Sequence, residues 1–253
     1  MNVFSLILII LSVLYGFLGI IVIQRNKRSV VNRLFFVLNM SLVIWSFTAA
    51  LFISAPDLAT CIIWHKLSLI GIFLYFGILL HFFLEFTQEE KLLKQWWMYI
   101  VLYLPSTIFS YKEITTDFFA KAYSHGSNGW IISAQIGSMW FWALIAYCII
   151  YACVCVLLSY RRQKTAISLR ERKQAGVLLI LCAASLFTGL IIVAFAFILR
   201  SDIPDITSIA VAIWSVGIFY AINKYKMMAM TPAFIAENLF QTIIDSVILA
   251  DPG

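Results

Sequence analysis

Seven apolar segments dominate the sequence, and each is long enough, or nearly so, to cross the hydrocarbon core of a membrane. That core is roughly 30 Å thick, which takes about 20 helical residues. The segments lie near residues 3–23, 34–54, 61–86, 95–111, 138–160, 175–199 and 207–222. Hydrophobic residues make up 63% of the chain and charged residues only 12%, which excludes an ordinary soluble domain. The sequence therefore predicts an all-α fold, a polytopic membrane bundle of seven helices.

Lysine and arginine are distributed unevenly between the connections that join these segments. Alternate connections carry 14 of the 18 basic residues, and six of the 14 lie between residues 161 and 173. Basic residues concentrate in cytoplasmic loops. We therefore expect the N-terminus outside and the C-terminus in the cytoplasm. The net charge of +6 then reflects this topology and contact with anionic membrane lipids, and it does not call for nucleic acid.

The sequence contains no recognisable catalytic motif. It has no H-E-x-x-H, no G-x-S-x-G, no Walker loop and no Gly-rich nucleotide turn. The C-x-C at Cys153 and Cys155 points to opposite sides of a helix and has no neighbouring histidine, so we predict no metal and no cofactor. The seventh segment lacks the lysine that a retinal Schiff base requires, which sets a light-driven pump aside.

Polar residues within the third segment are candidates for function, because such groups are costly inside a membrane. Lys66 either extends outward to the lipid headgroups or acts as a buried cation for an anionic ligand. His81 and Glu85 are four residues apart and so share one helical face. They pair with each other structurally, or they form a signal-coupling site near the cytoplasm.

Several aromatic residues are candidates to line a pocket together with Lys66. Trp45 and Trp214 lie several residues inside their helices, away from the usual interfacial belt. An apolar cavity with a few polar anchors is the usual make-up of a small-ligand site. The predicted ligand-binding residues in the outer half of the bundle are Trp45, Trp64, His65, Lys66, Tyr75 and Trp214. Plain helix packing is the simpler explanation for any one of the tryptophans.

The connection at residues 111–137 is the longest on the outer side. Its apolar stretches "FFAKAYS" and "WIIS" flank the turn sequence "HGSNG", which predicts a β-hairpin between the fourth and fifth helices. The hairpin either covers a cavity or only joins the two helices.

The last 30 residues predict a helix followed by a short strand. Thr231 and Pro232 are typical of a helix start. Ile235, Leu239 and Ile243 then recur at helical spacing, which predicts an apolar face that couples the signal through a homodimer. The run "SVILADPG" resembles the first strand and turn of a sheet. We expect a sensor domain at residues 1–223, a signalling helix at 224–246 and the start of another domain at 247–253.

Four stretches together resemble a known family. They are "NRLFFVLNMSLVIWSF", "IIWHKLSLIGIFLYFGILLHFFLEFT", "YRRQKTAISLRERKQAGVLLI" and "AINKYKMMAMTPAFIAENLFQTIIDSVILADPG". Their order is similar to the N-terminal seven-span sensor region of bacterial histidine kinases, which also precedes diguanylate cyclases. The resemblance implies the bacterial cytoplasmic membrane, a PAS domain that opens with "SVILADPG", and an output domain further on. It implies no particular ligand.

Kinase chemistry itself is not expected in this chain. The only histidines are His65, His81 and His125, and none falls in a predicted cytoplasmic segment. A response regulator would be a partner only through a separate kinase part. We therefore predict a membrane receptor module for a small, lipophilic or fatty-acid-like signal, with Lys66 as the partner of its carboxylate. The alternative is a small transporter or channel; a lipid-modifying enzyme would need a nucleophile or metal cluster that the sequence lacks.

Overall fold

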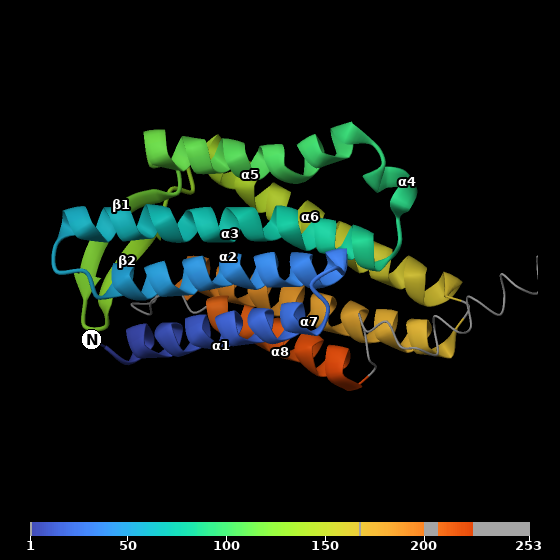
Figure 1. Cartoon of the computed structure of the whole chain (residues 1–253). Coiled ribbons are helices and arrows are strands. Elements are labelled where there is room, and N and C mark those ends of the chain that lie inside the picture. The colour runs from blue at the N-terminus through green and yellow to red at the C-terminus, as the bar shows by residue number, and fades with distance from the viewer. Residues whose placement is uncertain (1, 167, 200–206, 225–253) are drawn as a thin grey trace, which may run out of the picture.

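The computed structural model describes residues 2–166, 168–199 and 207–224 (Figure 1). Its long helices are α1 (Val3–Arg25), α2 (Val30–Ile53), α3 (Leu58–Phe86), α5 (Trp96–Thr116), α6 (Met139–Thr165), α7 (Leu169–Leu199) and α8 (Thr207–Lys224). A single helical turn, α4 (Glu90–Leu93), precedes α5, and two strands, β1 (Ala120–Gly126) and β2 (Gly129–Ala134), follow it. Each predicted apolar segment thus falls on one long helix.

Local sequence signals explain where the first three helices begin. Asn2, Ser29 and Asp57 each stand immediately before a helix and accept a hydrogen bond from the backbone N–H three residues later. Such caps satisfy one of the N–H groups that the first helical turn leaves unpaired. The short polar connections between the apolar segments therefore supply the helix start signals.

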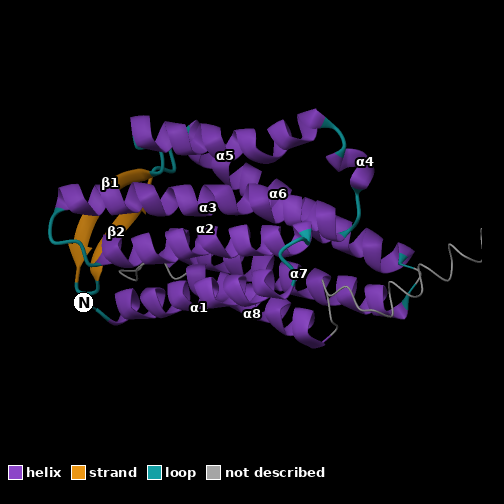
Figure 2. Ribbon diagram, viewed as in Figure 1, coloured by secondary structure: helices purple, strands orange, loops and turns teal. Residues whose placement is uncertain are grey.

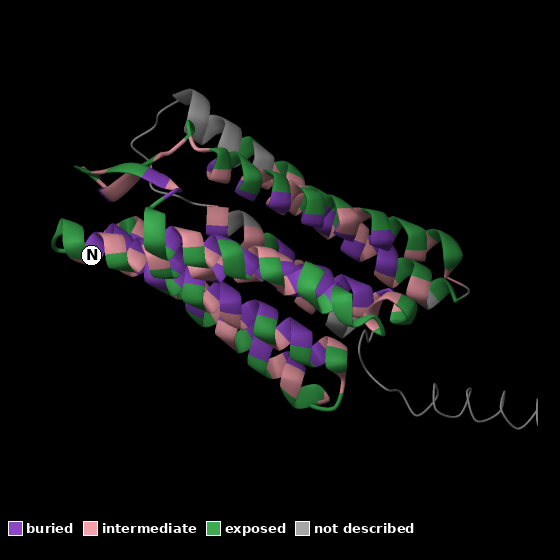
Figure 3. Cartoon of the chain, turned by 90° about the horizontal axis from the view of Figure 1, so that it is seen from above, coloured by how far each residue is buried: buried purple, intermediate pink, exposed green. Residues whose placement is uncertain are grey.

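Neighbouring helices close a ring. Helix α1 packs against α2 and α8, α2 against α3, α3 against α6, and α7 against both α6 and α8. Helix α5 packs against α3 (Figure 1). Buried residues gather on the facing sides of the helices, and exposed residues cover the outer faces (Figure 3). The largest fully buried side chains include Tyr15, Phe35, Phe73, Phe82, Phe141 and Trp214.

The composition of the helices suits a membrane. Among the described residues, α1, α2, α3 and α6 are long and apolar enough to cross one, and α8 contains a shorter apolar stretch, Val211–Ala221. The protein is thus a helical membrane bundle. The number of spans and the orientation of the termini stay predictions. The predicted signalling helix, with Ile235, Leu239 and Ile243, and the predicted strand at 247–253 lie outside the described residues.

The segment between α5 and α6 forms a two-stranded antiparallel hairpin (Figure 2). It lies at the same end of the bundle as the N-terminus and the α2–α3 turn, which we call the hairpin end (Figure 1). The α1–α2 turn, α4 and the α6–α7 turn lie at the opposite end, which we call the basic end.

Candidate functional site

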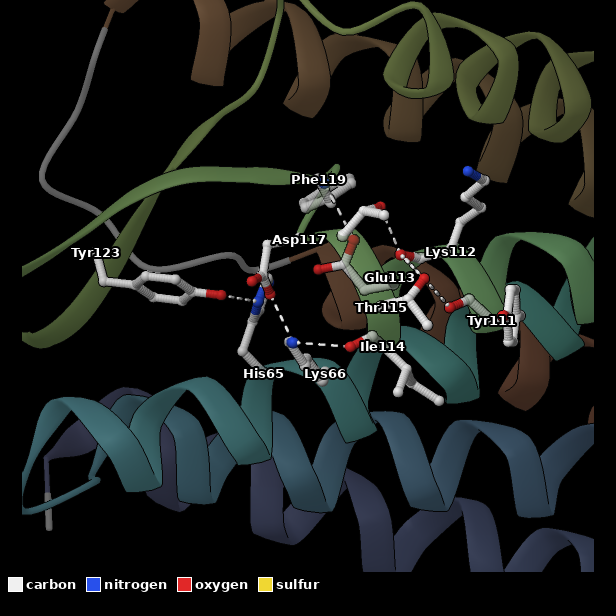
Figure 4. A network of polar contacts seen from close by, with 11 residues as sticks. His65, Lys66, Tyr111, Lys112, Glu113, Ile114, Thr115, Asp117, Phe119 and Tyr123 are labelled. Atoms are coloured by element: carbon white, nitrogen blue, oxygen red, sulfur yellow. Dashed lines mark hydrogen bonds and ion pairs between the residues drawn. The ribbon is translucent and has the colours of Figure 1, made fainter.

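Lys66, the predicted partner of an anionic ligand, lies at the hairpin end and forms an ion pair within the protein (Figure 4). Its Nζ atom lies 2.7 Å from Oδ1 of Asp117, the residue that terminates α5. The same atom donates a 3.2 Å hydrogen bond to the backbone carbonyl of Ile114 in the last turn of α5. A lysine at that position stabilises a helix, because the last carbonyls are unpaired and carry the negative end of the helix dipole. Lys66 therefore fastens α3 to the C-terminal end of α5.

The chain reverses direction directly after this ion pair. Asp117 adopts left-handed backbone angles, φ 47° and ψ 45°, which aspartate tolerates better than most residues. One helical turn earlier, the fully buried Glu113 accepts a 3.0 Å hydrogen bond from the backbone N–H of Phe119. The second carboxyl oxygen of Glu113 has no hydrogen-bond partner in the described part of the chain. Both acidic residues thus hold the tight turn that leads from α5 into the hairpin.

A histidine joins α3 to the hairpin itself. Nδ1 of His65 lies 2.9 Å from the hydroxyl of Tyr123 on β1. His65 is 3% exposed, and its ring contacts the rings of Phe52 and Phe119. Burial raises the pKa of Tyr123 well above its ordinary value, and the nearby carboxyl groups of Glu113 and Asp117 raise it further. The tyrosine therefore remains a neutral phenol that hydrogen-bonds to a buried imidazole.

The far tip of the hairpin is attached to the ends of α1 and α2. The indole N–H of Trp130 donates a 2.8 Å hydrogen bond to the carbonyl of Ala55, and the side chain of Asn2 donates to the carbonyl of Asn128. At Gly129, φ is +104° and a Cβ atom would collide with the carbonyl oxygen of Ile53. Only glycine fits this conformation and this close approach. We call the residues His65, Lys66, Glu113, Asp117 and Tyr123 the hairpin-end network.

Two more polar contacts join α3 to its neighbours below this network. The hydroxyl of Tyr147 on α6 lies 2.8 Å from Ser106 of α5 and donates a 3.2 Å hydrogen bond to the carbonyl of Phe73. Further along, Nδ1 of His81 lies 2.7 Å from the hydroxyl of Tyr103. These contacts follow α3 at intervals of eight residues, or about 12 Å. They pair neighbouring helices at separate levels and do not form a continuous polar path among the described residues, as a channel would need.

The six predicted ligand-binding residues lie at different levels of the bundle. His65 and Lys66 belong to the hairpin-end network, and Trp64 packs in the small apolar cluster beneath the hairpin. Tyr75 contacts Trp214 edge to face, with 6.1 Å between ring centroids, about 15 Å further along α3. Trp45 lies on α2, where its backbone passes against Gly71. The six residues thus extend over about 15 Å along α3, and their ligand-binding role stays a prediction.

The predicted coupling residues take a different arrangement from the one expected. Nδ1 of His81 bonds to Tyr103 on the facing helix rather than to Glu85. His81 also contacts the ring of Tyr99, with 5.6 Å between centroids. The histidine thus links two helices.

The sequence interpretation did not single out Glu113, Asp117, Tyr123 or Tyr103. A signal was present for the first two, because they are the only acidic residues between 111 and 137. A lysine inside an apolar segment needs a nearby anion, and these two were available on the longest outer connection. Nothing in the sequence distinguishes Tyr103 or Tyr123 from the other tyrosines.

A family model described as the N-terminal 7TM region of histidine kinase matches residues 7–232. Because this match covers most of the chain, the protein belongs to that family. No curated protein matched the sequence. The chain is therefore a multi-pass membrane sensor region of the histidine kinase type, and the matched region is not itself catalytic.

Proposed function

We propose that the chain is the sensor region of a bacterial two-component histidine kinase in the cytoplasmic membrane, with the hairpin end outside. It binds a small lipophilic signal at that end and relays the binding event to a cytoplasmic output domain. Family membership supports the kinase context, and the 14 basic residues on alternate connections support the orientation.

The ion pair between Lys66 and Asp117 carries the proposal. The Lys66 side chain is 21% exposed and that of Asp117 is 53% exposed, so solvent reaches the pair. Exposed ion pairs contribute only about 0–1 kcal/mol, so another carboxylate can replace Asp117 at small cost. The carboxylate of a fatty-acid-like ligand has the required charge, and its chain would lie along the apolar surface of α3 and α5. Exchange of the two carboxylates would release the end of α5 from α3 and so weaken the attachment of the hairpin, which the His65–Tyr123 bond also holds.

The relay follows from the helices that the network connects. Helix α3 runs 29 residues from the hairpin end to the basic end and contacts α2, α5 and α6. Helix α8 contacts α3 through Trp214 and precedes residues 224–246, the proposed signalling helix and dimer contact. A ligand shifts this arrangement only if it binds the released form better than the fastened form.

Ligand binding to the intact chain tests the proposal. Hexadecanoic acid is titrated into protein held in phosphatidylcholine nanodiscs, and binding is followed by the fluorescence of the tryptophans. We expect saturable binding to the wild type, much weaker binding to Lys66→Gln, and unchanged binding to Lys121→Gln, a matched lysine on β1. Hexadecanol, which lacks the carboxylate, should bind far less.

A second readout links binding to the hairpin. Cys61 is fully buried in the apolar cluster beneath the hairpin, so a membrane-impermeant thiol reagent reaches it only when the hairpin opens. Hexadecanoic acid should accelerate its labelling. Equal binding to the Lys66 and Lys121 variants, or binding without faster labelling, would contradict the proposal.

A further inference from the structure

A shallow, open groove at the basic end lies outside the site proposed for the signal. Its volume is about 440 Å³, and it runs between the end of α6 and the first three turns of α7. Gln163 lines it from α6, and Leu169, Arg172, Lys173, Gly176, Val177 and Ile180 line it from α7. The α7 residues follow one another at three- and four-residue spacing, so they form a single face of that helix.

The mouth of the groove carries two cations, Arg172 and Lys173, that pair with no carboxylate among the described residues. The nearest acidic residue in sequence, Glu171, pairs with Arg162 at 2.9 Å, and Arg162 also bonds to the side-chain oxygen of Gln88. Within residues 2–166, 168–199 and 207–224, no carboxylate forms an ion pair with Arg172 or Lys173. The mouth therefore presents two adjacent exposed positive charges to an external anion.

Apart from Gln163, the rest of the groove is apolar. Gly176 leaves its floor open, since a Cβ atom there would lie 2.9 Å from the side-chain nitrogen of Gln163. Val177 and Ile180 continue toward the middle of the bundle, and Ile180 is 67% exposed. Ile180 lies about 10 Å beyond Lys173 along the helix axis. A ligand that fits both parts has an anionic head and a hydrocarbon tail.

We propose that this groove binds one anionic phospholipid of the leaflet at the basic end. Arg172 and Lys173 hold the phosphate, for which the planar guanidinium offers two parallel hydrogen bonds. The amide of Gln163 donates to the ester oxygens, and one acyl chain lies over Gly176, Val177 and Ile180. Free phosphate shares the head chemistry but would leave the apolar part unused. The site is independent of the signal site at the hairpin end.

Native mass spectrometry of the full chain in a neutral detergent tests this proposal with phosphatidylglycerol and phosphatidylcholine as probes. We expect the wild type to retain one phosphatidylglycerol in preference to phosphatidylcholine. Arg172→Gln with Lys173→Gln should weaken retention by roughly tenfold or more, because each basic residue near an anionic surface contributes about fivefold. Lys27→Gln with Arg28→Gln removes the same two charges from the exposed α1–α2 turn and should change retention less than twofold.

Gly176→Leu fills the groove but keeps both charges, and it should also lose the lipid. If the double variant at 172 and 173 fails to fold, Gly176→Leu still tests whether the groove binds the lipid. Equal losses in the two double variants would overturn the proposal, since they would mean diffuse charge attraction. Equal retention of both lipids would overturn it, and so would displacement of the lipid by an equal concentration of glycerol phosphate. A groove covered by a second copy or by the residues after Lys224 would bind no added lipid, which would overturn it as well.

Discussion

Both ends of the bundle contain ion pairs, but two cations of the basic end, Arg172 and Lys173, differ from Lys66 at the hairpin end. At the hairpin end, Lys66 pairs with Asp117 and His65 with Tyr123, so polar groups far apart in the sequence satisfy one another. At the basic end, Arg172 and Lys173 have no internal anion in the described part of the chain. Internal pairing fastens elements together, whereas unpaired cations attract an external anion. The first end is thus suited to a conformational change and the second to a lipid.

Glycines at the two ends provide the strongest test of this contrast. Gly129→Ala forces a Cβ atom into the carbonyl oxygen of Ile53 at φ +104°, a conformation that alanine rarely adopts. We expect a loss of about 2 to 4 kcal/mol in stability. Thermal unfolding in detergent and the labelling rate of Cys61 measure it. Gly137→Ala, at a position with nothing within 4 Å of the added atom, is the control and should change neither value.

Gly176→Ala at the basic end sharpens the same comparison. The added Cβ atom meets only the movable end of the Gln163 side chain, so we expect the variant to lose less than about 1 kcal/mol of stability. A similar loss at Gly129 and Gly176 would show that the hairpin end is no more tightly fastened than the basic end.

A double-mutant cycle on His65 and Tyr123 tests whether the hairpin is held by their hydrogen bond. His65→Phe and Tyr123→Phe each leave a buried partner unpaired, which costs about 1 to 3 kcal/mol. The double variant removes both groups, so its loss should be smaller than the sum of the single losses. Both the unfolding midpoint and the labelling of Cys61 are measured.

The pair formed by His81 and Tyr103 is the matched control for this cycle. It has the same chemistry at 2.7 Å but lies toward the basic end of α3. Its variants should lower the unfolding midpoint without changing the labelling rate of Cys61. Additive losses at His65 and Tyr123, or equal labelling in both cycles, would contradict a local role for the first bond.

The sequence predicted individual elements better than their relative positions. Long apolar runs are sufficient to predict the seven helices, and "HGSNG" between β-prone stretches is sufficient to predict a hairpin, because both signals are local. The hairpin-end network joins residues about 50 positions apart or more, and no local pattern encodes such a pairing.

The predicted pocket shows the same limit. It grouped Trp214, in the outer or central half of its helix, with Lys66 and Tyr75. In the structure, the hydroxyl of Tyr15, 12 residues into α1, bonds to the carbonyl of Ser208 near the start of α8. Helix α8 is therefore displaced along the bundle by about 18 Å relative to the start of α1. Trp214 thus meets Tyr75, another of the predicted residues, deeper along α3 than Lys66, because helix packing and not sequence position determines depth.

Neutralising the charged residues at each end should give the smallest changes in stability, and these changes should differ between the two ends. Lys66→Gln with Asp117→Asn removes a partly exposed pair and should cost no more than about 1 kcal/mol, with a loss that shrinks as salt is raised. Arg172→Gln with Lys173→Gln should cost nothing in neutral detergent, because these cations form no ion pair with a carboxylate in the described part of the chain. Added phosphatidylglycerol should then raise the unfolding midpoint of the wild type but not of this variant, because a ligand stabilises only the form that binds it. A loss in neutral detergent at 172 and 173 equal to that at 66 and 117 would mean that the cations of the basic end have partners within the protein, and the contrast between the two ends would fail.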